Sequence, residues 1–254
     1  MNFSINFANV IISLSSCKMA REKVFRFKQF SVVNDKTAMK VGTDGVLLGA
    51  WCDVEGAKRV LDVGTGCGLI ALMVAQRNRD AHIEAIDIDP NAITEAMTNI
   101  TTSPWSDRVK AKCVDFNDFA AQEPYDLIVS NPPFFTENVM APERCRNMAR
   151  HSVTLTLDQL ISHSKHLLAH NGRLAFIYPA EQDLSVRRCA VKHAMSIKRF
   201  TSVVPVEGSA AKRTLWELSK GPTNTVVEEI IIKVSTSSYS QQYIDLTRDF
   251  YLKM

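Results

Sequence analysis

The residues best suited to chemistry stand together in the stretch 130–135, Ser-Asn-Pro-Pro-Phe-Phe. A planar amino nitrogen, such as that of adenine or of a side-chain amide, is a weak nucleophile because its lone pair is delocalised. The side-chain oxygen of Asn131 and the carbonyl of Pro132 could accept its two hydrogens and free that lone pair. Phe134 offers a face on which a planar group can stack. We therefore expect Asn131, Pro132, Pro133 and Phe134 to act on a planar amine.

The element that must position these residues is a short strand at 125–129, Tyr-Asp-Leu-Ile-Val. It is mostly apolar, rich in branched residues and too short for a helix, which predicts a buried parallel strand. Two prolines cannot continue a strand ladder, so the chain after Ser130 must form a stiff, extended loop. By themselves, the two prolines favour an ordinary loop after a strand over a ligand site. The polar Asn131 before it and the aromatic Phe134 after it favour a ligand site at the carboxyl end of the strand.

A second candidate site is the glycine-rich stretch 64–68, Gly-Thr-Gly-Cys-Gly, between a predicted strand at 59–63 and a predicted helix at 69–76. Its G-x-G-x-G spacing differs from the dinucleotide pattern G-x-G-x-x-G. Asp62 would repel a pyrophosphate but would tolerate a cationic amino-acid group. The glycines let the backbone approach a ligand closely. These features assign to a cofactor site the residues Asp62, Gly64, Thr65, Gly66 and Gly68.

Acidic residues also follow the next two predicted strands, at 82–87 and 108–114. Asp87 could accept both ribose hydroxyls of an adenosine-bearing cofactor. Asp115 could accept the adenine amine while the ring of Phe116 lies on the adenine face. Each acid alone could equally be a helix cap, but acids at three successive strand ends favour the ligand interpretation. We therefore add to the cofactor site Asp87, Ile88, Asp115 and Phe116.

The segment ahead of the glycine turn contains an alternating, strand-like stretch at 24–33 and a predicted helix that Thr43 or Asp44 could cap. One interpretation is a capped helix with no further role. The other is that residues 40–44 cover the amino-acid end of the cofactor. On the second interpretation the cofactor site also includes Lys40, Gly42 and Thr43. We assign Asn131 to the cofactor site as well.

The composition is that of one globular α/β domain: 254 residues, 46% hydrophobic and 22% charged, which is long enough for a large core. A net charge of +3 permits an anionic partner without requiring one. The six cysteines are scattered and form no C-x-x-C pair, a pattern typical of reduced cytosolic thiols rather than of disulfides or a zinc site.

Residues 1–17 carry no charge, and their apolar run at 7–14 is too short to span a membrane. A secretory signal would begin with basic residues, which are missing. The stretch 14–17, Leu-Ser-Ser-Cys, does look like a lipoprotein cleavage box, which is the alternative. We expect residues 1–18 to be a dispensable or misassigned extension ahead of Met19. Residues 19–254 should form a single domain that does not associate with membranes.

The glycine turn, the Asn-Pro-Pro-Phe motif and the sequence around them resemble the class I S-adenosylmethionine-dependent methyltransferases. More narrowly, the chain is similar to the bacterial valine-tRNA adenine N6-methyltransferases. The glycine turn and the Asn-Pro-Pro-Phe motif are common to many methyltransferases. MKVGTDGVLLGAW (39–51) and the tail ending FYLKM are more specific. Phe134 is a mild departure, since related enzymes often have tyrosine there. The matching stretches lie between residues 27 and 254: FKQFSVVNDKTAMKVGTDGVLLGAW, VLDVGTGCG, SPWSDRV, YDLIVSNPPFF and YSQQYIDLTRDFYLKM.

The resemblance implies an α/β, Rossmann-like fold with a seven-stranded, mostly parallel sheet, helices on both faces and an antiparallel last strand pair. It implies that S-adenosylmethionine donates a methyl group to the N6 amine of adenine 37 in a tRNA anticodon loop, most simply that of valine tRNA, and that S-adenosylhomocysteine is released. It further implies a cytoplasmic monomer that binds the anticodon stem-loop and uses no metal.

Basic residues beside the reactive loop are candidates for phosphate contacts, although a solvated charged loop is an equal alternative. Two more lie in the connection between predicted strands at 197–206 and 213–218. The candidate RNA-binding residues are Arg144, Arg146, Arg150, His151, Lys212 and Arg213.

Thr156 begins a capping box for a helix that should run to Ala169 and be ended by Asn171-Gly172. Its histidines have no converging acids, so we interpret them as surface residues rather than metal ligands: His163, His166 and His170.

Two rival functions stay open at this stage. A glutamine N5-methyltransferase of a protein substrate would share the Asn-Pro-Pro-Phe motif but should carry a helical substrate domain ahead of the glycine turn. A non-catalytic RNA-binding module could keep the same scaffold, but it would have no need of Asp62, Asp87, Asn131 and Pro132 together.

Overall fold

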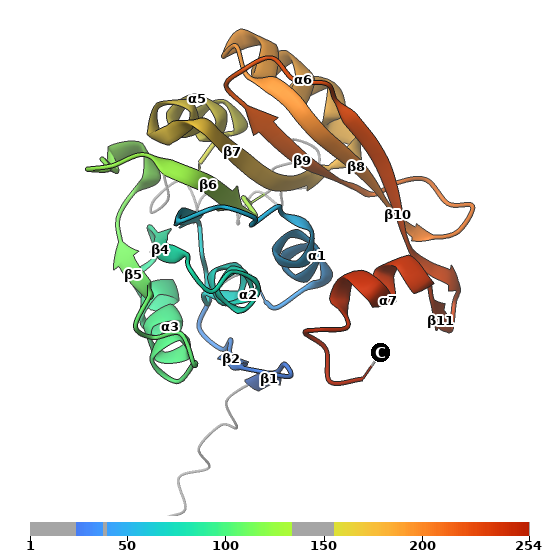
Figure 1. Cartoon of the computed structure of the whole chain (residues 1–254). Coiled ribbons are helices and arrows are strands. Elements are labelled where there is room, and N and C mark those ends of the chain that lie inside the picture. The colour runs from blue at the N-terminus through green and yellow to red at the C-terminus, as the bar shows by residue number, and fades with distance from the viewer. Residues whose placement is uncertain (1–23, 38–39, 134–154, 254) are drawn as a thin grey trace, which may run out of the picture.

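Parallel strands form the centre of the computed structural model, which describes residues 24–37, 40–133 and 155–253 (Figure 1). The strands are β1 Val24–Arg26, β2 Ser31–Val33, β3 Arg59–Val63, β4 His82–Asp87, β5 Val109–Cys113, β6 Tyr125–Ser130, β7 Leu168–Pro179, β8 Ser196–Val206, β9 Arg213–Ser219, β10 Val226–Ser235 and β11 Ser238–Tyr239. The helices are α1 Thr43–Trp51, α2 Leu69–Arg77, α3 Pro90–Thr101, α5 Leu157–Leu167, α6 Asp183–Lys192 and α7 Gln241–Thr247, with short 3-10 turns η1 Phe116–Asp118 and η2 Ala180–Gln182.

Within the described residues the main sheet has nine strands, in the order β11-β10-β8-β9-β7-β6-β3-β4-β5. The strands β3 to β7 are mutually parallel, and β9 runs antiparallel to both β7 and β8. The expected Rossmann-like class with the antiparallel pair β8–β9 is confirmed. The expected count of seven strands is wrong, because β10 pairs in parallel with β8 and β11 pairs with β10.

Helices cover both faces of the sheet (Figure 1). One apolar cluster joins α1, α2 and α3 to one face and also takes in Phe27 and Phe250 from the two ends of the described chain. A second cluster joins α5 and α6 to the other face. Helix α2 is buried throughout Leu69–Ala75, because it packs against α1 on one side and against strands β3, β4 and β5 of the sheet on another. This explains why its apolar residues run continuously rather than on one stripe.

The segment 24–33 forms two short antiparallel strands instead of one strand, because the chain turns back at Phe27, whose N–H donates to Phe30 O at 2.8 Å. The predicted side-chain cap on α1 is also wrong. Gly42 is the N-cap residue, and no side chain of the described residues caps the helix. The Asp44 carboxylate instead pairs with the Arg213 guanidinium at 2.8 Å.

The predicted capping box at the start of α5 is confirmed: Thr156 Oγ1 accepts from Gln159 N at 3.2 Å and Gln159 Oε1 accepts from Thr156 N at 2.9 Å. The predicted stop at Asn171-Gly172 is wrong, since α5 ends at Leu167 and both residues lie in β7. A Cβ atom at Gly172 would lie 2.6 Å from the Tyr125 carbonyl. Gly172 therefore serves the close approach of β7 to β6 and not a helix end.

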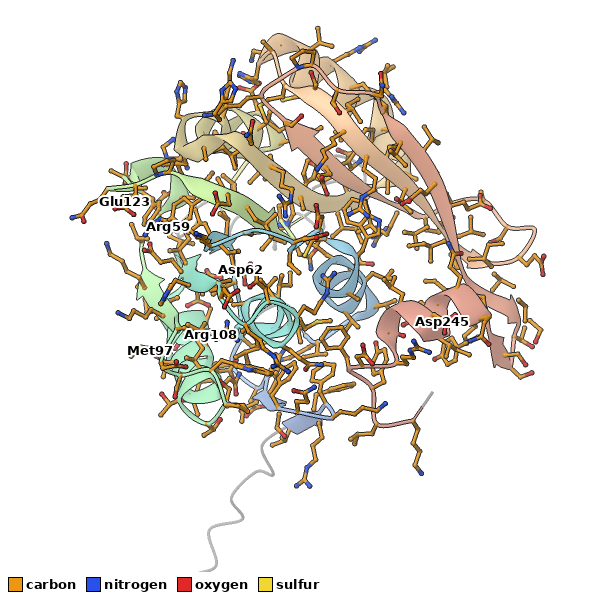
Figure 2. The ribbon with its side chains drawn as sticks, viewed as in Figure 1. Arg59, Asp62, Met97, Arg108, Glu123 and Asp245 are labelled. Atoms are coloured by element: carbon orange, nitrogen blue, oxygen red, sulfur yellow. The ribbon has the colours of Figure 1, made fainter. Side chains whose placement is uncertain are left out.

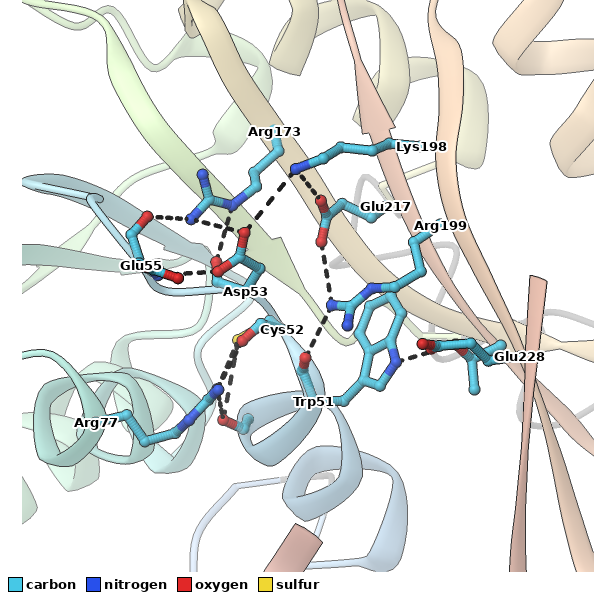
Figure 3. Close-up of polar contacts among 12 residues, drawn as sticks. Trp51, Cys52, Asp53, Glu55, Arg77, Arg173, Lys198, Arg199, Glu217 and Glu228 are labelled. Atoms are coloured by element: carbon cyan, nitrogen blue, oxygen red, sulfur yellow. Dashed lines mark hydrogen bonds and ion pairs between the residues drawn. The ribbon is translucent and has the colours of Figure 1, made fainter. Parts of the chain in front are cut away.

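A polar network fixes the carboxyl end of α1 to the distal strands of the sheet (Figure 3). The Arg199 guanidinium lies 3.8 Å from the centre of the Trp51 ring and donates to Trp51 O at 2.9 Å and to the buried Glu217 at 3.2 Å. Arg173 donates to the carbonyl of Asp53 at 2.9 Å. Since these bonds hold one end of α1, they also fix the position of its amino end.

No helix in the described part of the chain has the length and apolar composition needed to cross a bilayer.

Candidate active site

A cavity of about 580 Å³ lies at the carboxyl ends of β3, β4 and β6. Its volume falls within the range of about 300–1,000 Å³ that is usual for small-molecule sites. The topology explains its place, because parallel strands bring their carboxyl ends to one edge of the sheet. The sequence-predicted residues that line it are Lys40, Gly42, Thr43, Gly64, Thr65, Gly66, Asp87, Ile88, Asp115, Phe116, Asn131, Pro132 and Pro133.

Two predicted cofactor residues, Asp62 and Gly68, do not line this cavity. The other predicted residues near the reactive loop lie outside the described residues: Phe134, Arg144, Arg146, Arg150 and His151.

The glycine turn needs left-handed backbone at all three glycines, with φ of 69° at Gly64, 56° at Gly66 and 85° at Gly68. Among the described residues, no atom would lie within 4 Å of a Cβ atom added at Gly64 or Gly66, so this part of the structure leaves room for a ligand beside the turn. At Gly68 the added Cβ would lie 3.5 Å from Ala96. Gly68 therefore serves the start of α2 and its packing against α3.

Asp62 is completely buried beneath this turn, beside α2 (Figure 2). Its Oδ2 accepts the Thr65 hydroxyl at 2.6 Å and the Ala71 N–H at 3.1 Å. Its Oδ1 is buried and has no hydrogen-bond partner among the described residues. Burial raises the pKa of this carboxyl to about 7. Asp62 thus shapes the turn, and in its ionised form it would favour a nearby cation.

Replacing Asp62 with asparagine should remove a pH dependence of stability in the cofactor-free protein. The unfolded carboxyl ionises near its ordinary pKa of 3.8, whereas the folded one keeps its proton until about pH 7. The folded state binds the extra proton in that window, so its stability should fall as pH rises from about 4 to about 7. The loss from this group should approach roughly 4 kcal/mol. Urea unfolding of both proteins across that range tests this, and parallel stability curves would contradict it.

Asp87 is the last residue of β4 and lines the cavity. Both of its carboxylate oxygens already accept hydrogen bonds from backbone N–H groups. Oδ2 accepts from Gly66 N and Oδ1 accepts from Asp89 N, both at 2.9 Å. Burial raises the pKa of this carboxyl. Since each carboxylate oxygen has two lone pairs, one per oxygen stays available for a ligand hydroxyl. The carboxylate is therefore oriented by the glycine turn before any ligand binds.

Asp115 both caps a turn and lines the cavity, so the two sequence-level alternatives do not exclude each other. Its Oδ1 accepts from Asn117 N at 2.8 Å, which starts η1. The Phe116 ring stands edge-on to the His163 ring, with 4.8 Å between centres, and His163 Nε2 lies 2.9 Å from Phe119 O. The prediction that His163 is a surface residue is wrong, because this half-buried side chain supports Phe116. His170 lies in β7 rather than on the helix.

The reactive loop begins at the end of β6, where Ser130 Oγ donates to Val63 O at 2.8 Å. This bond ties the carboxyl end of β6 to that of β3. Asn131, Pro132 and Pro133 then line the same cavity as the glycine turn. The structure thus brings the amine-binding candidates and the cofactor candidates to one space.

Sequence reasoning missed the residues that hold the segment 34–37 over the cavity, where Asn34 and Thr37 also line it. Glu95 accepts the N–H groups of Asp35 at 2.7 Å, Lys36 at 2.5 Å and Thr37 at 3.0 Å. These bonds lower the pKa of Glu95 against its burial.

Asn99, one turn along α3 from Glu95, bonds both the N–H and the carbonyl of Val33, at 2.8 and 2.9 Å, and the Cys67 carbonyl at 2.8 Å. The signal was two polar residues four apart on the buried stripe of α3. Lys40 closes the same segment by donating to Asp35 O at 2.8 Å and Thr37 O at 3.0 Å.

Replacing Glu95 with alanine should loosen the segment 34–37 and weaken cofactor binding about tenfold, since three backbone N–H groups lose a charged acceptor. Glutamine should have a smaller effect, because its amide oxygen can still accept. Titration calorimetry measures both affinities. Met97→Ala, on the exposed side of the same helix (Figure 2), is the matched control. Equal affinities for all the proteins would show that the segment does not cover the ligand.

The two basic candidates after β8 differ in their surroundings. Arg213 is tied to Asp44 at the start of α1, whereas Lys212 is exposed. Arg213 is the first residue of β9 and Lys212 comes just before it, at the same edge of the sheet as the cavity. Their contact with RNA stays a prediction.

Three side chains that could in principle bind a metal lie where α5 meets the end of α6: Asp158, Cys189 and His193. None of the three lines the cavity. The Lys192 ammonium donates to Asp158 Oδ1 at 2.7 Å and His193 Nε2 lies 2.9 Å from the same oxygen. These partners lower the pKa of Asp158 to about 2. The cluster is therefore an ion pair between two helices.

Comparison with solved structures places this geometry among methyltransferase folds. A predicted O-methyltransferase from Agrobacterium tumefaciens superimposes with a TM-score of 0.64 at 16% identity, covering 82% of this chain and 96% of that one. A protein from Listeria monocytogenes, described as a class I S-adenosylmethionine-dependent methyltransferase, gives a TM-score of 0.53 at 17% identity over 80% of this chain and 65% of its own. At these identities the likeness shows the fold alone.

Sequence comparison is more specific. The profile of the methyltransferase small domain family matches residues 37–195. A tRNA1(Val) (adenine(37)-N6)-methyltransferase from Phocaeicola vulgatus is 43% identical, covering 91% of this chain and 98% of its own. One of the same name from Trichodesmium erythraeum is 44% identical, covering 90% and 98%. The chain therefore belongs to the methyltransferase small domain family, alongside these tRNA1(Val) (adenine(37)-N6)-methyltransferases.

Proposed function

We propose that this protein transfers the methyl group of S-adenosylmethionine to the N6 amine of adenine 37 in tRNA1(Val) and releases S-adenosylhomocysteine. The observation that carries the proposal is the position of Asn131 and Pro132 on the wall of the cavity that the glycine turn and Asp87 also line. The names of relatives that match nearly their whole length support the choice of substrate.

The residues around the cavity fit this cofactor. Open space beside Gly64 and Gly66 admits a close ligand, and the Asp87 carboxylate has free lone pairs for ribose hydroxyls. Asp115 and Phe116 offer an acceptor and a ring for adenine. The buried Asp62 has an unsatisfied oxygen and so favours a cationic group near Thr65. When bound, the cofactor supplies an electrophilic methyl group.

Residues of the protein itself act on the target amine. Asn131 Oδ1 and the Pro132 carbonyl accept the two amine hydrogens of the target base and turn its lone pair towards the methyl group. Methylation leaves a positive charge on the nitrogen, which then releases one of these hydrogens as a proton to solvent, so no strong base is required in this arrangement. Correct placement of two reactants can contribute about 7–11 kcal/mol, which is more than general-base catalysis usually supplies.

The substrate should enter as an unpaired base, because an adenine beside the anticodon lies in a single-stranded loop and costs little to turn outward. We propose that Phe134 stacks on this base. The candidates for phosphate contacts around the anticodon stem-loop are Arg144, Arg146, Arg150, His151, Lys212 and Arg213.

We further propose that residues 19–254 form one domain, since Phe27 and Phe250 pack in one core cluster, and that it acts as a cytoplasmic monomer.

The proposed substrate is tested by nucleoside mass spectrometry of tRNA from cells with and without the gene. Loss of N6-methyladenosine from tRNA1(Val) in the deletion strain is the expected result. An unchanged tRNA nucleoside profile would reject it. Loss of N5-methylglutamine from a protein instead would favour the glutamine-modifying alternative, and no methylation change of any kind would favour the non-catalytic RNA-binding module.

A further inference from the structure

A second cavity, of about 570 Å³, adjoins the first and shares with it Val41, Gly42 and Thr43. Its other walls come from β1, from the ends of β8 and β10, and from β11, α7 and the tail after it. Strand β9 is antiparallel to both β7 and β8, and β10 is parallel to β8. The carboxyl ends of β8 and β10 therefore lie at the same edge of the sheet as the first cavity.

Aromatic rings dominate this second cavity. The Tyr239 and Tyr243 rings stack with 5.2 Å between centres and 27° between planes. Tyr243 is buried and supports Tyr239, which is 45% exposed. Phe25, which also lines this cavity and is 38% exposed, meets the Tyr251 ring edge-on at 6.2 Å. Two partly exposed rings, Tyr239 and Phe25, thus line the cavity, and each contacts another ring.

Two lysines accompany the rings. Lys233 Nζ lies 5.4 Å from the centre of the Tyr239 ring, and Lys253 is exposed on the tail. Neither forms an ion pair with a carboxylate in the described part of the chain, in contrast to Arg213, whose charge is matched by Asp44. Unmatched cations beside exposed rings are the combination that binds single-stranded nucleic acid, since the rings stack on bases and the lysines meet phosphates.

From this geometry we infer that the surface formed by Phe25, Lys233, Tyr239, Tyr251 and Lys253 binds an unpaired nucleotide of the tRNA loop next to the target base. The inference rests on the proposed tRNA substrate. Because the two cavities share the wall at 41–43, a loop whose target base occupies the first cavity can reach these rings with the next nucleotide. It also gives a role to the tail YSQQYIDLTRDFYLKM, which carries Tyr239, Tyr251 and Lys253 but no residue of the first cavity.

Binding of tRNA1(Val) transcript to Tyr239→Ala and Tyr239→Phe tests the stacking role. The alanine variant should raise Kd and KM for tRNA about 5- to 100-fold, whereas phenylalanine, which keeps the ring, should behave like the parent. Cofactor affinity should not change in either. A tRNA affinity of Tyr239→Ala within twofold of the parent would overturn the stacking role.

The double variant Lys233→Ala/Lys253→Ala tests the charges of this surface while all of its aromatic rings are kept. Its plot of log affinity against log salt should be shallower by about 1.4, the value for two single-strand phosphate contacts. Lys110→Ala, on the distant edge strand β5, is the matched control and should keep the parental slope. A parental slope in the double variant would overturn the inference. If the parent itself does not methylate tRNA, the proposed function fails; parental methylation with unaffected variants rejects this surface alone.

Discussion

Replacing Asn131 with alanine is expected to lower kcat by about 10²- to 10³-fold, which is the usual loss when one positioned hydrogen-bonding group is removed from a transition state. The affinity for tRNA should change little. The Asn131 oxygen accepts an amine hydrogen most strongly when the nitrogen becomes tetrahedral, so its loss should appear in kcat rather than in binding. Steady-state methylation of the tRNA1(Val) transcript measures both quantities.

A control for this variant is Pro132→Ala, because the backbone carbonyl at that position is retained. Its loss of rate should therefore be smaller and should come from a less rigid loop. Cofactor affinity and melting temperature of Asn131→Ala should stay near the parental values. Near-normal turnover of Asn131→Ala would exclude its side chain from the reaction.

Replacing Asp87 with alanine is expected to raise the Kd for S-adenosylmethionine about 10- to 150-fold, since hydrogen bonds to a charged group contribute about 1.5–3 kcal/mol. Asp87 also holds the Gly66 N–H, so part of the loss should come from a less ordered glycine turn. Asparagine keeps one acceptor oxygen and should lose less. Titration calorimetry measures the three affinities.

Asp80 offers a matched control for Asp87. It lies just before β4, at the opposite end of the strand from Asp87, and its side chain is exposed. Asp80→Ala should therefore bind the cofactor like the parent. An Asp87→Ala protein with parental affinity would remove that carboxylate from the cofactor site.

The site residues that follow the carboxyl ends of parallel strands could be predicted from the sequence. Short apolar runs predict buried strands, and parallel strands bring their carboxyl ends together whatever the details of packing. That rule alone places Asp87, Asp115 and Asn131 around one cavity, although they are far apart in the sequence.

What could not be predicted depends on contacts between distant segments. Strand β10 pairs with β8, but its first residues are exposed, and Glu228 and Glu229 interrupt its apolar pattern. Gly172 resembles a helix stop until the approach of the Tyr125 carbonyl is known. The burial of Asp62 and the hydrogen bonds from backbone N–H groups to Glu95 likewise depend on which distant segments pack against these two residues.

The most direct test of the account is methylation of two tRNA1(Val) transcripts that differ only at position 37, one with adenine and one with guanine. Purified protein and S-adenosylmethionine are incubated with each, and the modified nucleoside is identified and mapped by mass spectrometry. N6-methyladenosine is expected at position 37 of the adenine transcript, with no methyl transfer to the guanine transcript. Equal methylation of both transcripts, or a methyl group at another position of the first, would contradict it.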